Sequence, residues 1–352
     1  MAANAPFLAG VIEGFYGRSW SWQARAEYAG FLSSHGMASY IYAPKDDPFL
    51  RKQWREAWPA QQWSQLIALR QTYREAGVSW GLGLSPFELY RDFGPKAQSD
   101  LRKKLAEIKL LQPDVFCLLF DDMRGDLPQL AHSQLEICAQ VAQELPDTRL
   151  IVCPTYYSFD PVLEKVFGSR PTAYWRDLGA GLADNWDVFW TGDKVVSESY
   201  PAESLVEITR LLGRKPILWD NYPVNDGERA SQYLHLSPAD RPVELKQLTG
   251  GLLANPMNQP ASSTIPLYAL SRSLLNNEVS LADSLEYLLP PSLAIQILED
   301  RECLETQGLG LISVADRERM ALQYGVIDHP VAIEICQWLA GDFEFDPACL
   351  TG

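Results

Sequence analysis

The feature that most constrains the fold of this chain is a regular alternation of short apolar segments with longer amphipathic ones. Helical periodicity separates the apolar segments, for example over residues 22–34, 61–76, 100–111, 133–145 and 202–212. The apolar segments have the length of strands buried on both faces, and they lie at residues 7–12, 39–43, 78–84, 115–120, 149–153, 186–190, 216–219 and 250–254. Eight strands that alternate with helices predict a closed α/β barrel, the TIM barrel or (β/α)8 fold. An open doubly wound sheet is the alternative.

The pattern changes after Asn258. The sequence there predicts short helices separated by proline and glycine, at residues 267–275, 280–289, 292–306, 313–324 and 331–339. We therefore expect a barrel domain over residues 1–265 and a small C-terminal helical region over residues 266–352. The helical region is expected to cover apolar barrel surface. A homodimer contact or one wall of a substrate groove is the alternative role.

The net charge and the residue composition limit the kinds of partner that this chain can bind. The formal net charge of -15 argues against nucleic acid and anionic membrane surfaces, because both require clustered lysine and arginine. The first residues carry no basic leader, and no apolar run approaches the roughly 20 residues of a membrane span. We expect a cytoplasmic protein. Eleven tryptophans and fifteen tyrosines supply core volume, and they also provide flat apolar walls of the kind on which sugar rings stack.

Two adjacent carboxylates, Asp121 and Asp122, directly follow the fourth apolar run. Side chains alternate along a strand, so both aspartates can serve one site only if the strand has just ended and the backbone turns. Such a pair suits acid–base or metal chemistry, because like-charge repulsion favours one protonated and one ionised group. A solvated helix cap is the ordinary alternative for an isolated pair.

The other predicted strands also end in polar or aromatic residues. In a barrel these ends meet on one face and build one pocket, with carboxylates, amides, a lysine and a Trp and Tyr wall. No nucleophile elbow, phosphate loop or helical zinc motif occurs, and the four histidines are scattered. We therefore expect neither a cofactor nor a metal. Asp46 and Asp47 are a second candidate for a hard metal beside Asp121 and Asp122, but the adjacent Lys45 already supplies positive charge. A surface ion pair is the ordinary alternative for Asp46 and Asp47.

Five blocks resemble glycoside hydrolase family 84, the O-GlcNAcases and related β-N-acetylglucosaminidases. They are GVIEGFYG at residues 10–17, YIYAPKDD at 40–47, LLFDD at 118–122, WTG at 190–192, and WDN at 219–221 followed by Asn225 and Asp226. The resemblance runs in unbroken order from about residue 7 to residue 258. It implies a TIM barrel and removal of terminal β-linked N-acetylglucosamine with retention, in which the 2-acetamido oxygen of the substrate is the nucleophile.

The resemblance also implies roles for individual residues. Asp121 would orient and polarise the acetamido N–H, and Asp122 would protonate the leaving oxygen and then activate water. The implied sugar contacts are Gly14, Lys45, Tyr157, Trp219, Asn221, Asp226 and Asn255. Substrate-assisted glycosidases are recognised exceptions to the arrangement with one carboxylate on each ring face, so two carboxylates on one side are consistent with this chemistry.

Three positions depart from the family pattern: Ser19, Tyr156 and Met123. Tyr156 adjoins an implied sugar contact and leaves the aglycone preference open. The expected partner is a glycoprotein, glycopeptide or oligosaccharide that carries N-acetylglucosamine, with hyaluronan fragments disfavoured by the acidic charge. The competing hypotheses are a catalytically silent sugar-binding barrel and a metal-dependent hydrolase.

Overall fold

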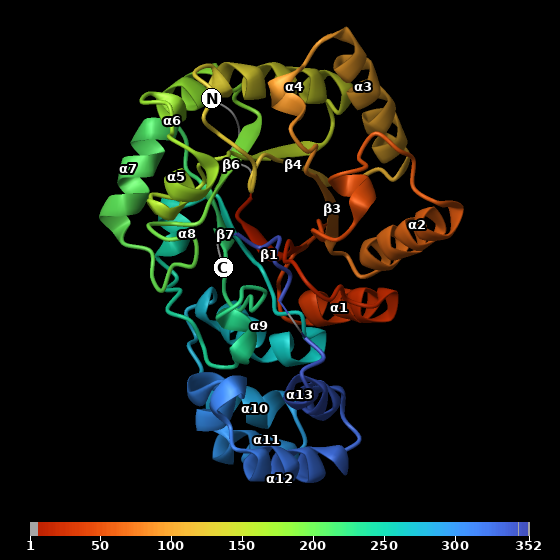
Figure 1. The fold of residues 1–352 in the computed structure, drawn as a ribbon, viewed down its shortest axis with the longest axis vertical. Helices are drawn as coiled ribbons and strands as arrows, with labels where there is room; N and C mark the ends of the chain where they lie inside the picture. Colours follow the sequence, from red (N-terminus) through yellow and green to blue (C-terminus); the bar gives the residue numbers. More distant parts are fainter. Residues whose placement is uncertain (1–5, 344, 351–352) are drawn as a thin grey trace.

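The computed structural model describes residues 6–343 and 345–350. Its centre is a closed barrel of eight parallel strands in sequence order, with β8 paired to β1. Figure 1 shows the helices arranged around this barrel. The strands are β1 (Leu8–Glu13), β2 (Ser39–Tyr42), β3 (Ser79–Leu84), β4 (Val115–Leu119), β5 (Arg149–Cys153), β6 (Trp186–Trp190), β7 (Ile217–Asp220) and β8 (Gly251–Ala254). The predicted TIM barrel is therefore confirmed, and every predicted strand end lies within one residue of the observed end.

The barrel closes tightly because small residues occupy points where strands approach each other. Gly10 of β1 pairs with Ser39 of β2. A Cβ atom on Gly10 would lie 1.9 Å from the backbone oxygen of Ser39, so no larger residue fits there. Leu82, Phe116, Leu150 and Val188 are completely buried in the same core.

Helices surround the barrel in the order that the sequence predicts. They are α1 (Trp22–Ser34), α2 (Ala60–Glu75), α3 (Pro95–Leu110), α4 (Leu130–Glu144), α5 (Val162–Phe167), α6 (Tyr174–Gly181), α7 (Ala202–Leu212), α8 (Leu245–Leu248) and α9 (Pro260–Ser273). Helix α3 begins five residues earlier than the periodicity indicates, because Pro95 occupies the first turn, where a missing N–H costs nothing. The short helices α5, α6 and α8 lack a long apolar period and were not predicted.

Four further helices pack below the barrel in Figure 1, as α10 (Leu281–Leu288), α11 (Pro291–Glu299), α12 (Val314–Gly325) and α13 (Pro330–Ala340). They enclose a second hydrophobic core that contains Leu285, Tyr324 and Trp338. The single helix expected over residues 292–306 is wrong. Helix α11 ends at Glu299, and a separate π-helical turn covers Cys303–Gln307.

Helix α9 connects the two cores, since it contacts both α1 of the barrel and α13 of the helical region. It begins at Pro260 rather than at residue 267 and carries Pro266 in its interior. The sequence predicts that the helix starts after Pro266, because a proline inside a helix is destabilising. In the structure most of α9 is buried, and the packing outweighs the cost of the internal proline. A domain division at residue 265 falls inside this helix and stays a prediction.

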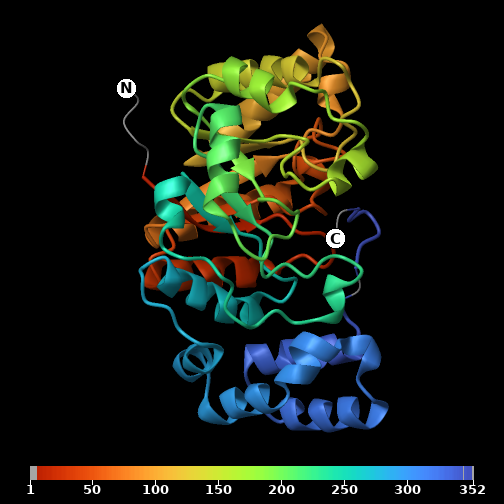
Figure 2. The ribbon, with the colours of Figure 1, turned by 90° about the vertical axis from the view of Figure 1, so that its left-hand side faces the viewer.

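In the part of the chain that the structure describes, no helix combines the length and apolarity that a bilayer crossing requires. After α13 the chain runs back from the helical region to the open face of the barrel, where the strands end (Figures 1 and 2).

Candidate active site

One cavity opens at the carboxyl ends of the barrel strands. All nine residues that the sequence nominates line it, namely Gly14, Lys45, Asp121, Asp122, Tyr157, Trp219, Asn221, Asp226 and Asn255. They come from the ends of six different strands. The closure of the barrel is what places these distant segments around one space.

The backbone turns sharply at the aspartate pair. Strand β4 ends at Leu119, and the Phe120 N–H still donates to the Cys153 oxygen of β5 at 2.9 Å. Asp122 then adopts a left-handed conformation with φ of 57°. This conformation is uncommon for a residue other than glycine, although aspartate tolerates it better than most. It breaks the alternation of the strand, so that both carboxyls face the same cavity.

Asp121 and Lys45 form a buried ion pair. The Lys45 ammonium donates to Asp121 Oδ2 and lies 3.9 Å from Asp122 Oδ2, and the Lys45 side chain is only 2% exposed. Among the described residues, the other Asp121 oxygen, Oδ1, is buried and has no hydrogen-bond partner. A buried acceptor without a partner is costly unless a ligand or water completes it. Asp121 therefore has one oxygen available for a donor in the cavity.

Both oxygens of the Asp122 carboxyl accept tyrosine hydroxyls. Tyr16 donates to Oδ2 at 2.8 Å, and Tyr157 donates to Oδ1 at 3.2 Å. Burial raises the pKa of Tyr16 well above its ordinary value, so its hydroxyl remains a donor. Arg51 adds a hydrogen bond at 3.1 Å to the Asp122 backbone oxygen. The two tyrosine contacts orient the Asp122 carboxyl, and the Arg51 contact holds the backbone that carries it.

Sequence reasoning did not nominate Tyr16 or Arg51. Tyr16 follows the end of β1 and stands two residues after Gly14, so its place in the block at residues 10–17 was the available signal. Arg51 follows the short 3-10 helix Pro48–Leu50. Nothing in the sequence around it indicates a contact with Asp122, which lies 71 positions later in the chain.

A chain of amide contacts orders one side of the cavity. Asn221 Oδ1 accepts the Trp219 indole N–H at 2.9 Å and the Asn255 side-chain N–H at 3.0 Å. Asn255 Oδ1 in turn accepts the Gly14 N–H at 3.1 Å. A Cβ atom on Gly14 would lie 2.3 Å from the Trp219 ring, so glycine is needed for the indole to form this wall.

Asp226 is a buried carboxyl on the same cavity. Its Oδ2 accepts the Tyr16 backbone N–H at 2.8 Å. Burial is the main cause that raises the pKa of Asp226 to about 6. This carboxyl therefore changes charge within the physiological pH range and faces a space lined by Tyr157 and Trp219.

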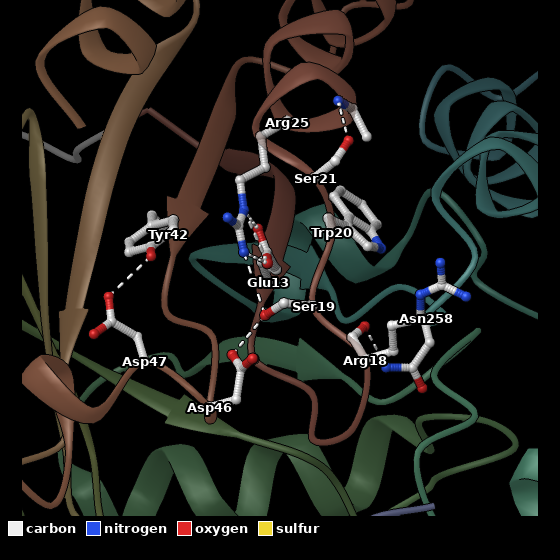
Figure 3. Close-up of polar contacts among 12 residues, drawn as sticks. Glu13, Arg18, Ser19, Trp20, Ser21, Arg25, Tyr42, Asp46, Asp47 and Asn258 are labelled. Carbon is white, nitrogen blue, oxygen red and sulfur yellow. Dashed lines mark hydrogen bonds and ion pairs between the residues drawn. The ribbon is translucent and has the colours of Figure 1, made fainter. Parts of the chain in front are cut away.

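The loop that carries Lys45 is held by a separate polar network, drawn in Figure 3. Ser19 donates to Asp46 at 2.5 Å, and the Arg25 guanidinium joins Ser19 to the buried Glu13. Four donors surround the Asp47 carboxylate, from Tyr42, Phe49, Trp58 and Gln62. Asp46 and Asp47 thus act in the structure as anchors of the loop. Across residues 6–343 and 345–350, no three His, Cys, Asp or Glu side chains gather in a group that could hold a metal ion.

Comparison with known proteins identifies the family. Residues 9–288 match the family model described as beta-N-acetylglucosaminidase. The chain is 34% identical over 276 residues to the Protein O-GlcNAcase of Rattus norvegicus and, equally, to that of Mus musculus. These matches cover 75% of this chain and 30% of each relative, so the chain spans less than a third of their length.

A solved structure agrees with this assignment. A mutant of the O-GlcNAc hydrolase of Thermobaculum terrenum superposes with a TM-score of 0.79 at 27% identity, over 95% of this chain and 80% of that one. The family match extends from the second residue of β1 to the end of α10. The chain belongs to the β-N-acetylglucosaminidases of glycoside hydrolase family 84.

Proposed function

We propose that this hydrolase removes terminal β-linked N-acetylglucosamine, including sugar on serine and threonine of glycoproteins, with retention of configuration. The substrate's own 2-acetamido oxygen is the nucleophile, and an oxazoline is the intermediate. Family membership supports the class of sugar. The O-GlcNAcases among its relatives support the glycoprotein substrate.

The observation that carries the mechanism is the state of Asp121. Its Oδ2 is occupied by Lys45, while its buried Oδ1 has no partner within the described part of the chain. An acetamido N–H in the cavity can complete this acceptor. As the acetamido oxygen attacks C1, positive charge develops on the amide, and a nearby carboxylate stabilises it.

Asp122 is suited to move the proton. In the first step the bond between C1 and the acetamido oxygen forms, the glycosidic bond breaks, and Asp122 gives its proton to the leaving oxygen. In the second step water attacks C1 while the bond between C1 and the acetamido oxygen breaks. The proton of the water passes to the Asp122 carboxylate, and the acetamido group is restored. The Tyr16 and Tyr157 hydroxyls hold the Asp122 carboxyl in one orientation through both steps.

The remaining cavity residues are suited to hold the sugar. Asp226 can accept hydrogen bonds from ring hydroxyls. Asn221 and Asn255 are ordered by the amide contacts described above. Trp219 and Tyr157 provide flat surfaces against which an apolar sugar face can pack.

The test separates the two aspartates by leaving-group dependence. We expect Asp122→Ala to be very slow on substrates with basic alkoxide leaving groups, and much less impaired on activated aryl glycosides that depart without a proton. We expect Asp121→Asn to be impaired on both, because ring closure is required with either leaving group.

Azide provides the control for the intermediate. It is expected to accelerate the Asp122 variant, whose intermediate lacks a base to activate water, and to leave the Asp121 variant nearly unchanged. Equal leaving-group sensitivity in the two variants, or azide rescue of Asp121→Asn alone, means that the roles are exchanged or shared.

A further inference from the structure

The chain after α13 returns to the mouth of the active site. Phe343 is buried, packs into the second hydrophobic core and lies under the Arg18 guanidinium at 5.0 Å. Beyond this anchor, Cys349 lines the same cavity as Asp121 and Asp122. We refer to residues 345–350 as the C-terminal strap.

The strap has a defined local structure. The Cys349 N–H donates to the Asp346 backbone oxygen at 2.9 Å, and the Ala348 N–H donates to Asp346 Oδ1 at 2.9 Å. Aspartate at the first position and Pro347 at the second are the residues that favour such a turn. The turn therefore presents Cys349 to the sugar cavity.

A second cavity of about 410 Å³ adjoins the first and shares Tyr16, Lys45 and Asp122 with it. Because Asp122 stands between the two spaces and is the proposed acid for the leaving oxygen, the second cavity lies on the leaving-group side. Strap residues Asp346, Ala348 and Leu350 line it. A leaving group that continues as a peptide in both directions therefore competes with the strap for space.

The strap brings a carboxylate to the second cavity, which already carries charges of both signs. Four cationic side chains line it, from Lys45, Arg51, Lys52 and Arg124, beside the barrel carboxylates of Asp46, Glu88 and Asp122. Two of these cations have partners outside the strap, Lys45 with Asp121 and Arg124 with Asp126. Asp346 is the carboxylate that the strap brings to this group.

The strap is only partly buried. Phe345 is 36% exposed and Leu350 is 55% exposed, so neither apolar side chain is enclosed as Phe343 is. Segments with few buried contacts open at low free-energy cost.

We propose that the C-terminal strap is a specificity-determining cover on the leaving-group side of the active site. This proposal rests on the proposed glycosidase function. Short leaving groups fit beneath the strap, whereas a glycopeptide reacts only after the strap has moved away.

The test compares two substrates with the same glycosidic bond, a glycosylated serine with blocked ends and a peptide of about ten residues with the same glycosyl-serine at its centre. The variant is the chain shortened to end at Phe343, which keeps the buried anchor. We expect the ratio of kcat/KM for the peptide to that for the serine to rise roughly three- to tenfold. That range is expected if the strap of the unshortened chain leaves the cavity uncovered about a tenth to a third of the time, because only this fraction can bind the peptide.

A point variant of the unshortened chain guards against misfolding of the shortened one. Asp346→Lys removes the side-chain acceptor of the Ala348 N–H and adds a positive charge beside Lys45 and Lys52, so the ratio is expected to rise in the same direction. Asp328→Lys makes the same charge change at an exposed position between α12 and α13, and its ratio is expected to equal that of the unmodified chain.

An unchanged ratio in both strap variants overturns the proposal. A parallel loss of activity on both substrates also overturns it, because the strap is then a wall of the sugar site. If the unmodified chain hydrolyses neither substrate, the proposed function has failed instead. The strap is then judged by the dissociation constant of an S-linked glycopeptide, which must be lower for the shortened chain.

Discussion

Replacing Lys45 with alanine tests whether its buried positive charge supports the reaction. The ammonium group pairs with Asp121 and lies 3.9 Å from Asp122. Its removal leaves the two buried carboxyls without their cation. A charge-assisted hydrogen bond of this kind contributes about 1–3 kcal/mol, so we expect kcat/KM to fall roughly 5- to 150-fold.

The assay is steady-state hydrolysis of an aryl N-acetylglucosaminide, with thermal unfolding measured in parallel to confirm that the variant is folded. Lys109→Ala is a suitable control, because this lysine is exposed in the last turn of α3, away from the cavity. Wild-type kcat/KM in Lys45→Ala would refute the reasoning, since it would mean that the ion pair has only a structural effect.

Three further predictions follow from the nucleophile and from two buried carboxyls. Replacing the substrate N-acetyl group with N-trifluoroacetyl should lower kcat/KM steeply, because electron withdrawal weakens the attacking oxygen; an unchanged value contradicts the internal nucleophile. Because Asp226 has a pKa of about 6, it becomes a full acceptor for sugar hydroxyls only above that pH. We therefore expect kcat/KM to rise as pH increases through about 6, and the pH profile of Asp226→Asn to lack this limb. Burial raises the pKa of Glu334, which accepts the Ala261 and Ser262 N–H groups of α9, from 4.5 to about 7. Between these two values the folded protein retains a proton that the unfolded chain has lost, so stability should fall as pH rises through this window, and Glu334→Gln should flatten the pH dependence of Tm.

The sequence alone determined the barrel and much of the cavity. Buried parallel strands are continuous apolar runs, so Val115–Leu119 and its counterparts were visible without tertiary information. The carboxyl ends of the strands in a barrel share one face, and therefore residues as distant as Gly14 and Asn255 could be assigned to one site. The left-handed turn at Asp122 was anticipated only as a requirement that the backbone must turn after the strand.

Tertiary structure decided the contacts that join residues far apart in the chain. Tyr16 reaches Asp122 across 106 positions and Arg51 reaches it across 71, and no local period encodes such pairs. The ionisation of Asp226 likewise depends on burial by several segments. The position of the C-terminal strap was invisible in the sequence for the same reason. Residues 345–350 carry no apolar period, and they lie at the mouth of the barrel after the packing of α13 against α9 and the burial of Phe343.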